Sequence, residues 1–217
     1  MYSYQYPHPA VTIDIVIFTI REAQLKLLLI KRKGEPFKGK WALPGGFLQL
    51  EESLEDGARR ELEEETGLSG VYLEQLYTFG HPERDPRERV ITVTYYALIP
   101  SEKIHLRAEA EAIGWFAMNE MPALAFDHPK IVNIAHHRLV AKLDYSTIAF
   151  QFMPDEFTLA QLQGVYEMIL QEEVDKRNFR KQILALDNLQ KTKQQRREGA
   201  HRPAFLYTLK KRRHIEW

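Results

Sequence analysis

The sequence of 217 residues predicts an α+β protein, with one layered domain of strands and helices followed by a smaller helical domain. Two observations carry this prediction. Over roughly the first 145 residues, apolar β-branched runs alternate with segments of helical spacing. Beyond Pro154 the pattern changes to two amphipathic helices and a short strand. We therefore expect domains at residues 1–146 and 147–217.

The first domain begins with strands. Residues 10–20 are β-branched and apolar, and residues 25–31 are similar, as buried strands are. A piece rich in Gly and Pro follows at residues 34–46 and predicts turns. Further strands are expected at residues 71–79, 89–99 and 112–117.

A helix with marked ends follows the turn-rich piece. Ser53 is expected to cap its N-terminus, with Asp56 three residues on in a capping-box arrangement. Gly67 stands where a glycine commonly ends a helix. A second helix is expected over residues 129–143, because its apolar residues recur at helical spacing.

The second domain has the order of elements of a winged helix-turn-helix. Residues 145–156 predict a short strand and connector, and a helix then starts at Thr158. A short acidic turn leads to a helix over residues 176–189, whose apolar stripe ends at Leu189. A polar stretch and a strand at residues 203–209 complete the pattern.

Carboxylates gather on one face of the first helix. Glu61, Glu64 and Glu65 stand at i, i+3 and i+4, where like charges repel one another. A bound Mg²⁺ or Mn²⁺ removes that penalty, since carboxylate oxygens are the ligands that these ions prefer. Arg60 and Glu52 are natural partners that hold the preceding loop to the helix. The alternative is an acidic helix face that is only solvated.

Residues 46–68 resemble the complete Nudix box, and residues 41–46 resemble the segment that usually precedes it in that family. The resemblance covers roughly residues 8–145. It implies a Nudix fold, a mixed sheet between helices, and hydrolysis of a nucleoside diphosphate linked to another group. It also implies metal ligation and water activation by particular residues. The implied metal ligands are Glu61, Glu64, Glu65 and the Gly46 carbonyl, and the implied catalytic set is Glu61, Glu64, Arg60 and Glu52.

A cluster of arginines before the strand at 89–99 suits phosphate or ribose recognition, because a guanidinium makes forked bonds to such oxygens. The alternative is an exposed charged turn. The segment 84–87 resembles that of bacterial Nudix proteins that handle ADP-ribose, as does Phe126-Asp127-His128. Phe37, Phe47 and Tyr95 are aromatic candidates for stacking on adenine. The expected ligand-binding residues are Arg84, Arg87, Arg89, Phe37, Gly45 and Gly46.

Charge is distributed unevenly although the chain is neutral overall. Residues 176–217 hold 13 Lys and Arg against three acidic residues, a local net charge of +10, so the rest of the chain carries −10. A basic helix and wing suit contact with DNA, while a dimerisation helix or a solvated surface are the alternatives. The expected DNA-binding residues are Lys176, Arg177, Asn178, Arg180, Lys181, Arg196, Arg197, His201 and Arg202.

The whole chain resembles the Nudix-related transcriptional regulators of NAD metabolism, on residues 175–181 and 199–204. The resemblance implies a homodimer on a palindromic operator in double-stranded DNA, with ADP-ribose as effector; some relatives respond to pentose sugars. Many such regulators have decayed boxes, whereas this box is complete. Two hypotheses therefore stand, a nucleotide-sensing repressor and a magnesium-dependent ADP-ribose pyrophosphatase with an accessory C-terminal domain.

The place of action is also an expectation. The chain has no cysteine, no basic and apolar start typical of a secretory signal, and no apolar run of about 18 residues that would predict a membrane span. We expect a cytoplasmic protein without a membrane partner.

Overall fold

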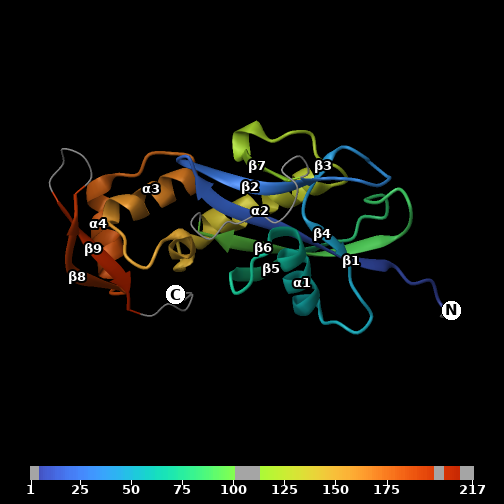
Figure 1. Cartoon of the computed structure of the whole chain (residues 1–217), viewed down its shortest axis with the longest axis horizontal. Coiled ribbons are helices and arrows are strands. Elements are labelled where there is room, and N and C mark those ends of the chain that lie inside the picture. Colours follow the sequence, from blue (N-terminus) through green and yellow to red (C-terminus); the bar gives the residue numbers. More distant parts are fainter. Residues whose placement is uncertain (1–4, 101–112, 198–202, 211–217) are drawn as a thin grey trace. The chain divides into compact units, whose positions relative to one another are not determined.

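A computed structural model describes residues 5–100, 113–197 and 203–210 (Figure 1). The chain forms two compact units, one comprising Met1–Thr19 with Lys26–His136 and the other Ile20–Leu25 with His137–Trp217. The helix α2 (His128–Lys142) runs through both. The boundary after residue 146 stays a prediction. None of the described helices is long and apolar enough to cross a membrane.

Within the described residues, seven strands of the first unit form one mixed sheet. Its central order is β3-β2-β1-β6-β5, while β4 pairs with β1 and β7 with β2. β1 and β6 are parallel, and β5 lies antiparallel to β6. The strands are β1 (Ala10–Arg21), β2 (Gln24–Lys31), β3 (Trp41–Ala42), β4 (Gly45–Phe47), β5 (Tyr72–Phe79), β6 (Val90–Ile99) and β7 (Ile113–Ala117).

All the expected strands of this unit are confirmed, but β3 and β4 lie inside the piece for which only turns were predicted. Both are short. Their strand conformation depends on partners distant in sequence, since Gly45–Phe47 pairs with Thr12–Asp14 of β1. This pairing places the glycine-rich loop directly beside the central strand.

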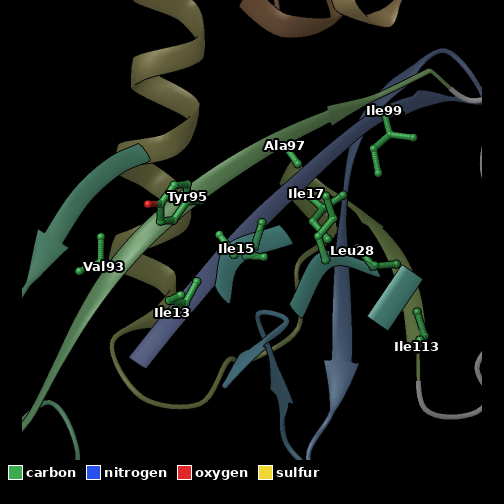
Figure 2. Close-up of a cluster of buried hydrophobic side chains, with 11 residues drawn as sticks. Ile13, Ile15, Ile17, Leu28, Val93, Tyr95, Ala97, Ile99 and Ile113 are labelled. Atoms are coloured by element: carbon green, nitrogen blue, oxygen red, sulfur yellow. The ribbon is translucent and has the colours of Figure 1, made fainter. Parts of the chain in front are cut away.

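The core lies on both faces of β1, because every residue from Ile13 to Thr19 is buried. One face carries Ile13, Ile15 and Ile17, which pack with residues of β6 in a single apolar cluster (Figure 2). Ala58 and Leu62 of α1 (Leu54–Thr66) join this cluster. α1 and α2 lie on the two sides of the sheet (Figure 1).

The ends of α1 follow the predicted chemistry with one difference. The Ser53 hydroxyl accepts a hydrogen bond from the Asp56 N–H at 3.1 Å, and Gly67 ends the helix with a φ of 72°. The Asp56 carboxylate accepts from the Ser53 hydroxyl at 2.7 Å. This bond takes the place of the backbone contact of a full capping box, for which Glu or Gln is the usual residue.

The second unit is a winged helix. A complete capping box of Thr158 and Gln161 starts α3 (Leu159–Leu170), and Asp175 caps α4 (Lys176–Ala185). The antiparallel pair β8 (Leu189–Arg196) and β9 (Ala204–Leu209) forms the wing. An isolated antiparallel bridge also joins Phe157, just before α3, to Tyr207 of β9.

Two expectations for this unit were wrong. The short strand expected within residues 145–156 is a 3-10 helix, η3 (Ile148–Phe152), where neighbouring rather than alternate residues are buried. The second helix ends at Ala185 instead of Leu189, because Asp187 adopts a φ of 50° and Leu189 pairs with Leu209 in β8. Cross-strand pairing thus overrides the helical spacing of Leu189.

Candidate functional site

One guanidinium organises the acidic helix. Arg60 donates to both carboxylate oxygens of Glu52, from Nη2 at 2.7 Å and from Nε at 3.0 Å. Its Nη1 donates to Glu61 at 2.7 Å and to Glu64 at 3.3 Å. The loop–helix link expected for Arg60 and Glu52 is therefore present, and the bonded Arg60 guanidinium, with the Gln49 N–H, lowers the pKa of Glu52 to about 2.

Gly46 lies directly against this cluster. A Cβ at this position would overlap the Glu61 carboxylate, so only glycine fits without displacing it. Glu61 is buried, and burial raises its carboxyl pKa. Burial also raises the pKa of Glu65, with smaller contributions from the charges of Glu61 and Glu64.

The donor set suits a hard divalent cation, although the carboxylates are not yet gathered around one point. Among the described residues, no group of three or more His, Asp or Glu side chains stands in a metal-binding arrangement. Arg60 Nη1 instead bridges Glu61 and Glu64, which places a positive charge between two of the expected ligands. Glu64 is 60% exposed and Glu65 partly exposed, so both side chains have room to turn.

A hollow of about 270 Å³ opens beside Gly45 and Gly46. Arg84 and Arg87 border it, as does Phe47, an exposed aromatic residue at its rim. The whole lining consists of Thr12, Asp14, Ile30, Arg32, Leu43, Gly45, Gly46, Phe47, Arg84, Asp85, Arg87, Phe126 and His128. Its size and its mixed lining suit a small polar ligand.

The three expected arginines have different surroundings. Arg84 is buried, and its guanidinium donates to Asp127 at 2.9 and 3.2 Å and to Asp14 at 3.3 Å. Arg87 is 41% exposed at its side chain and pairs with Asp85 at 2.7 Å. Arg89 lines neither this hollow nor a second hollow beside it, which Phe37 borders. Its guanidinium donates to the Gly80 carbonyl at 2.7 Å.

Aromatic residues divide between this hollow and a second one. Phe37 lines a neighbouring hollow of about 450 Å³, where its ring meets Phe126 edge-on at 4.9 Å. Arg84 and Phe126 border both hollows. At the first hollow Phe47 carries the Arg87 guanidinium 5.7 Å from its ring centre, an arrangement that leaves a flat apolar platform beside a cation.

Sequence reasoning missed the buried network behind the first hollow. His128 Nδ1 accepts the Leu43 N–H at 2.9 Å, so its proton sits on Nε2, 3.5 Å from Asp14. Burial lowers the pKa of His128 and keeps the ring neutral. The one available signal was the presence of an aspartate, Asp14, within an otherwise apolar buried strand.

The basic helix presents two faces. Phe179 and Ile183 are buried, and Phe179 meets Tyr166 edge-on at 5.1 Å. The opposite face carries exposed residues that were expected to contact DNA: Lys176, Arg177, Asn178, Arg180 and Lys181. Arg196 and Arg197 are exposed at the end of β8, while His201 and Arg202 lie outside the described residues.

Comparison with known proteins agrees with this two-part architecture. The NUDIX domain family model matches residues 9–136, and the model of the NrtR DNA-binding winged helix domain matches residues 149–209. The ADPR responsive transcriptional repressor NtrR of Acinetobacter baylyi is 39% identical over 207 residues, which cover 93% of this chain and 82% of that protein.

Solved structures give the same result. Shewanella oneidensis NrtR complexed with a 27mer DNA is 38% identical with a TM-score of 0.83, over 92% of this chain and 93% of that one. The NUDIX domain of that protein complexed with ADP ribose is 38% identical with a TM-score of 0.56, over 62% of this chain and 90% of that one.

The Nudix family generally uses a divalent metal. The matches extend through both units, with the order of domains and the complete acidic helix in place. The chain therefore belongs to the NrtR family of transcriptional regulators, in which a Nudix domain precedes a winged-helix DNA-binding domain.

Proposed function

We propose that this protein is a transcriptional repressor that binds operator DNA as a homodimer and responds to ADP-ribose. The observation that carries the proposal is the presence in one chain of a polar hollow beside the acidic helix and of a helix with exposed basic side chains in the winged unit. The first suits a nucleoside diphosphate sugar and the second suits a polyanion. Such a regulator acts where its DNA lies, which in a bacterium is the cytoplasm.

ADP-ribose has two kinds of group that the first hollow suits. Its diphosphate needs cationic donors, and the half-exposed Arg87 has a guanidinium that can turn from Asp85 toward it. Its adenine needs a flat apolar surface, which Phe47 offers at the rim. Arg84 is held by two carboxylates, so its part is to shape the hollow and to offset the charge of Asp14. Phe37 serves the neighbouring hollow.

The metal of this site is proposed to be Mg²⁺ or Mn²⁺, held by Glu61, Glu64, Glu65 and the Gly46 carbonyl. When bound, such an ion neutralises the diphosphate and makes a water molecule more acidic. Arg60 keeps Glu52 and the loop fixed to the helix and holds Glu61 beside Gly46. The residues thus suit ligation.

Hydrolysis of ADP-ribose is a second candidate function, and the intact Arg60–Glu52 link favours it. A purely sensory domain has no need of this complete set of carboxylates. A chain that slowly destroys its own effector would form a switch that resets itself. The two functions are compatible, since both use the same hollow.

A mobility shift with DNA from upstream of the gene tests the regulator. We expect sequence-specific binding that weakens steeply as salt rises, because cations displaced by the protein compete for the phosphates. Free ADP-ribose is expected to release the DNA. Absence of sequence-specific DNA binding at low salt would refute the proposal that the protein is a transcriptional regulator.

Turnover of ADP-ribose with Mg²⁺ tests the enzyme, with Glu64→Gln as the variant and Glu63→Gln as the matched control. Glu63 is exposed and lies outside the expected ligand set. Activity that survives Glu64→Gln, or equal loss in both variants, would refute the assigned metal roles.

A further inference from the structure

The winged unit contains a hollow that the proposed function does not yet assign. It has a volume of about 560 Å³ and lies between the start of α3, the helix α4 and the wing. The lining residues are Thr158, Leu159, Ala160, Gln163, Lys176, Arg180, Arg196, Pro203, Ala204, Phe205 and Tyr207. All belong to the described part of the second unit, so the hollow is a feature of that unit alone.

Charge in this hollow has one sign. Lys176 and Arg180 border it from α4, and Arg196 borders it from β8, whereas the described lining includes no acidic residue. Within the described residues, none of these three side chains has an ion-pair or hydrogen-bond partner. Positive groups facing one concave surface repel one another, and a bound anion reverses the sign of that interaction.

The uncharged part of the lining narrows the class of anion. Leu159 and Pro203 are apolar, and Phe205 is 38% exposed although aromatic. The Lys191 ammonium lies 3.3 Å from the centre of the Phe205 ring. Lys191 itself does not line the hollow. Cations together with an apolar wall match a phosphate that carries a sugar better than they match a bare inorganic ion.

The two charged sides of the hollow are set by different elements. Phe179 and Ile183 are buried beneath α4 and fix which of its residues face outward. The pairing of Arg196 with Ala204 fixes the end of β8 next to the wall residues Pro203 and Phe205. The helix and the wing therefore converge on one point as a consequence of the fold.

We propose that this hollow holds a single phosphodiester of the DNA backbone, shared by Lys176, Arg180 and Arg196, with its deoxyribose against the apolar wall. The proposal rests on the proposed DNA-binding function and adds the number and position of the phosphate contacts. Separate cations on a basic surface would each contact a different phosphate. Here a shared phosphate fixes the register of α4 along the duplex.

The test replaces single phosphates of the bound duplex by uncharged methylphosphonates, one position at a time. The proteins are the full-length chain and the variants Arg180→Gln and Arg196→Gln. Lys193→Gln is the matched control, because Lys193 is an exposed cation of the same wing strand and does not line the hollow. Affinity is measured at constant ionic strength.

At one phosphate position of the duplex, the methylphosphonate is expected to weaken DNA binding by the wild-type protein roughly tenfold or more, as for the loss of a charged hydrogen bond. Arg180→Gln and Arg196→Gln are expected to lose most of that sensitivity at the same position. Lys193→Gln is expected to keep it. Sensitivity lost at two different positions, or at none, would overturn the proposal while leaving operator binding intact.

Salt dependence provides a second readout that needs no operator. On a random-sequence duplex, the double variant Arg180→Gln/Arg196→Gln is expected to lower the slope of log affinity against log salt by at most about 0.9, because only one phosphate contact is lost. Each single variant is expected to lower the slope by less, because the remaining cations of the hollow still neutralise that phosphate. A loss of about 0.9 in each single variant and about 1.8 in the double variant would show separate phosphates and overturn the proposal. Inorganic phosphate that binds the hollow while DNA is bound would also overturn it.

Discussion

The buried His128 makes the stability of the first unit sensitive to mild acid. Its Nδ1 accepts the Leu43 N–H at 2.9 Å, so a proton on that nitrogen would remove the bond. Burial is the main cause that lowers its pKa from 6.5. The negative charges of Asp14 and Asp127 oppose this lowering of the pKa, while the positive charges of Arg84 and Arg32 add to it.

The sign of the pH dependence follows from this lowered pKa. Between the folded pKa and 6.5, the unfolded chain binds the His128 proton and the folded chain does not. The contribution to stability is therefore complete above pH 6.5 and falls as the pH drops below it. The slope is at most about 1.4 kcal/mol per pH unit, and it levels off once the pH falls below the folded pKa.

Urea unfolding at several pH values between 5 and 8 measures this slope, with the fluorescence of Trp41 and Trp115 reporting on the first unit. The chain has eight histidines, so the comparison with His128→Asn is essential. The asparagine oxygen keeps an acceptor for Leu43 and removes the titration. We expect a smaller loss below pH 6.5 in the variant. Equal slopes in both proteins would refute the assignment to His128.

Three further changes test other parts of the structure. Phe179→Ala removes a buried ring that packs on Tyr166, and calorimetry should show the winged unit destabilised by about 3–5 kcal/mol, with operator affinity falling in parallel; an unchanged unfolding transition would contradict this packing. Gly46→Ala forces a Cβ into the Glu61 carboxylate, and titration with Mn²⁺ should show weaker binding while DNA affinity stays constant. Arg84→Met leaves two carboxylates without their cation and should cost about 3 kcal/mol in urea unfolding; a cost under about 1 kcal/mol would show that solvent already screens the pair.

Much of the metal helix was predictable because its chemistry is local. Glu61, Glu64 and Glu65 share a face through helical periodicity alone, and Gly67 ends the helix through its own backbone freedom. The link of Arg60 to Glu52 spans eight residues, which the end of the loop and about two helical turns readily bridge. Such short-range relations follow from spacing, so the sequence suffices to locate them.

The ligand hollow was predictable only in part. Arg84 was expected to face a ligand, but it pairs with Asp14, 70 residues away, and with Asp127, 43 residues away. Asp14 lies on β1, whereas Arg84 precedes β6 and Asp127 precedes α2, so these side chains meet only in the folded chain. The pairing register of β1 decides which face Asp14 takes, and a shift of one residue would turn it to the other face. The spacing of residues along the chain does not predict that register.

The sequence by itself determined the order of the two domains, the acidic helix and the charge of the C-terminal part, since each depends on periodicity, capping or composition. Tertiary structure alone decided that Arg84 is buried, that Phe47 rather than Phe37 borders the hollow beside Gly46, and that Arg180 and Arg196 face one hollow. The physical reason is that side chains from distant segments become neighbours only when strand register and helix packing bring them together.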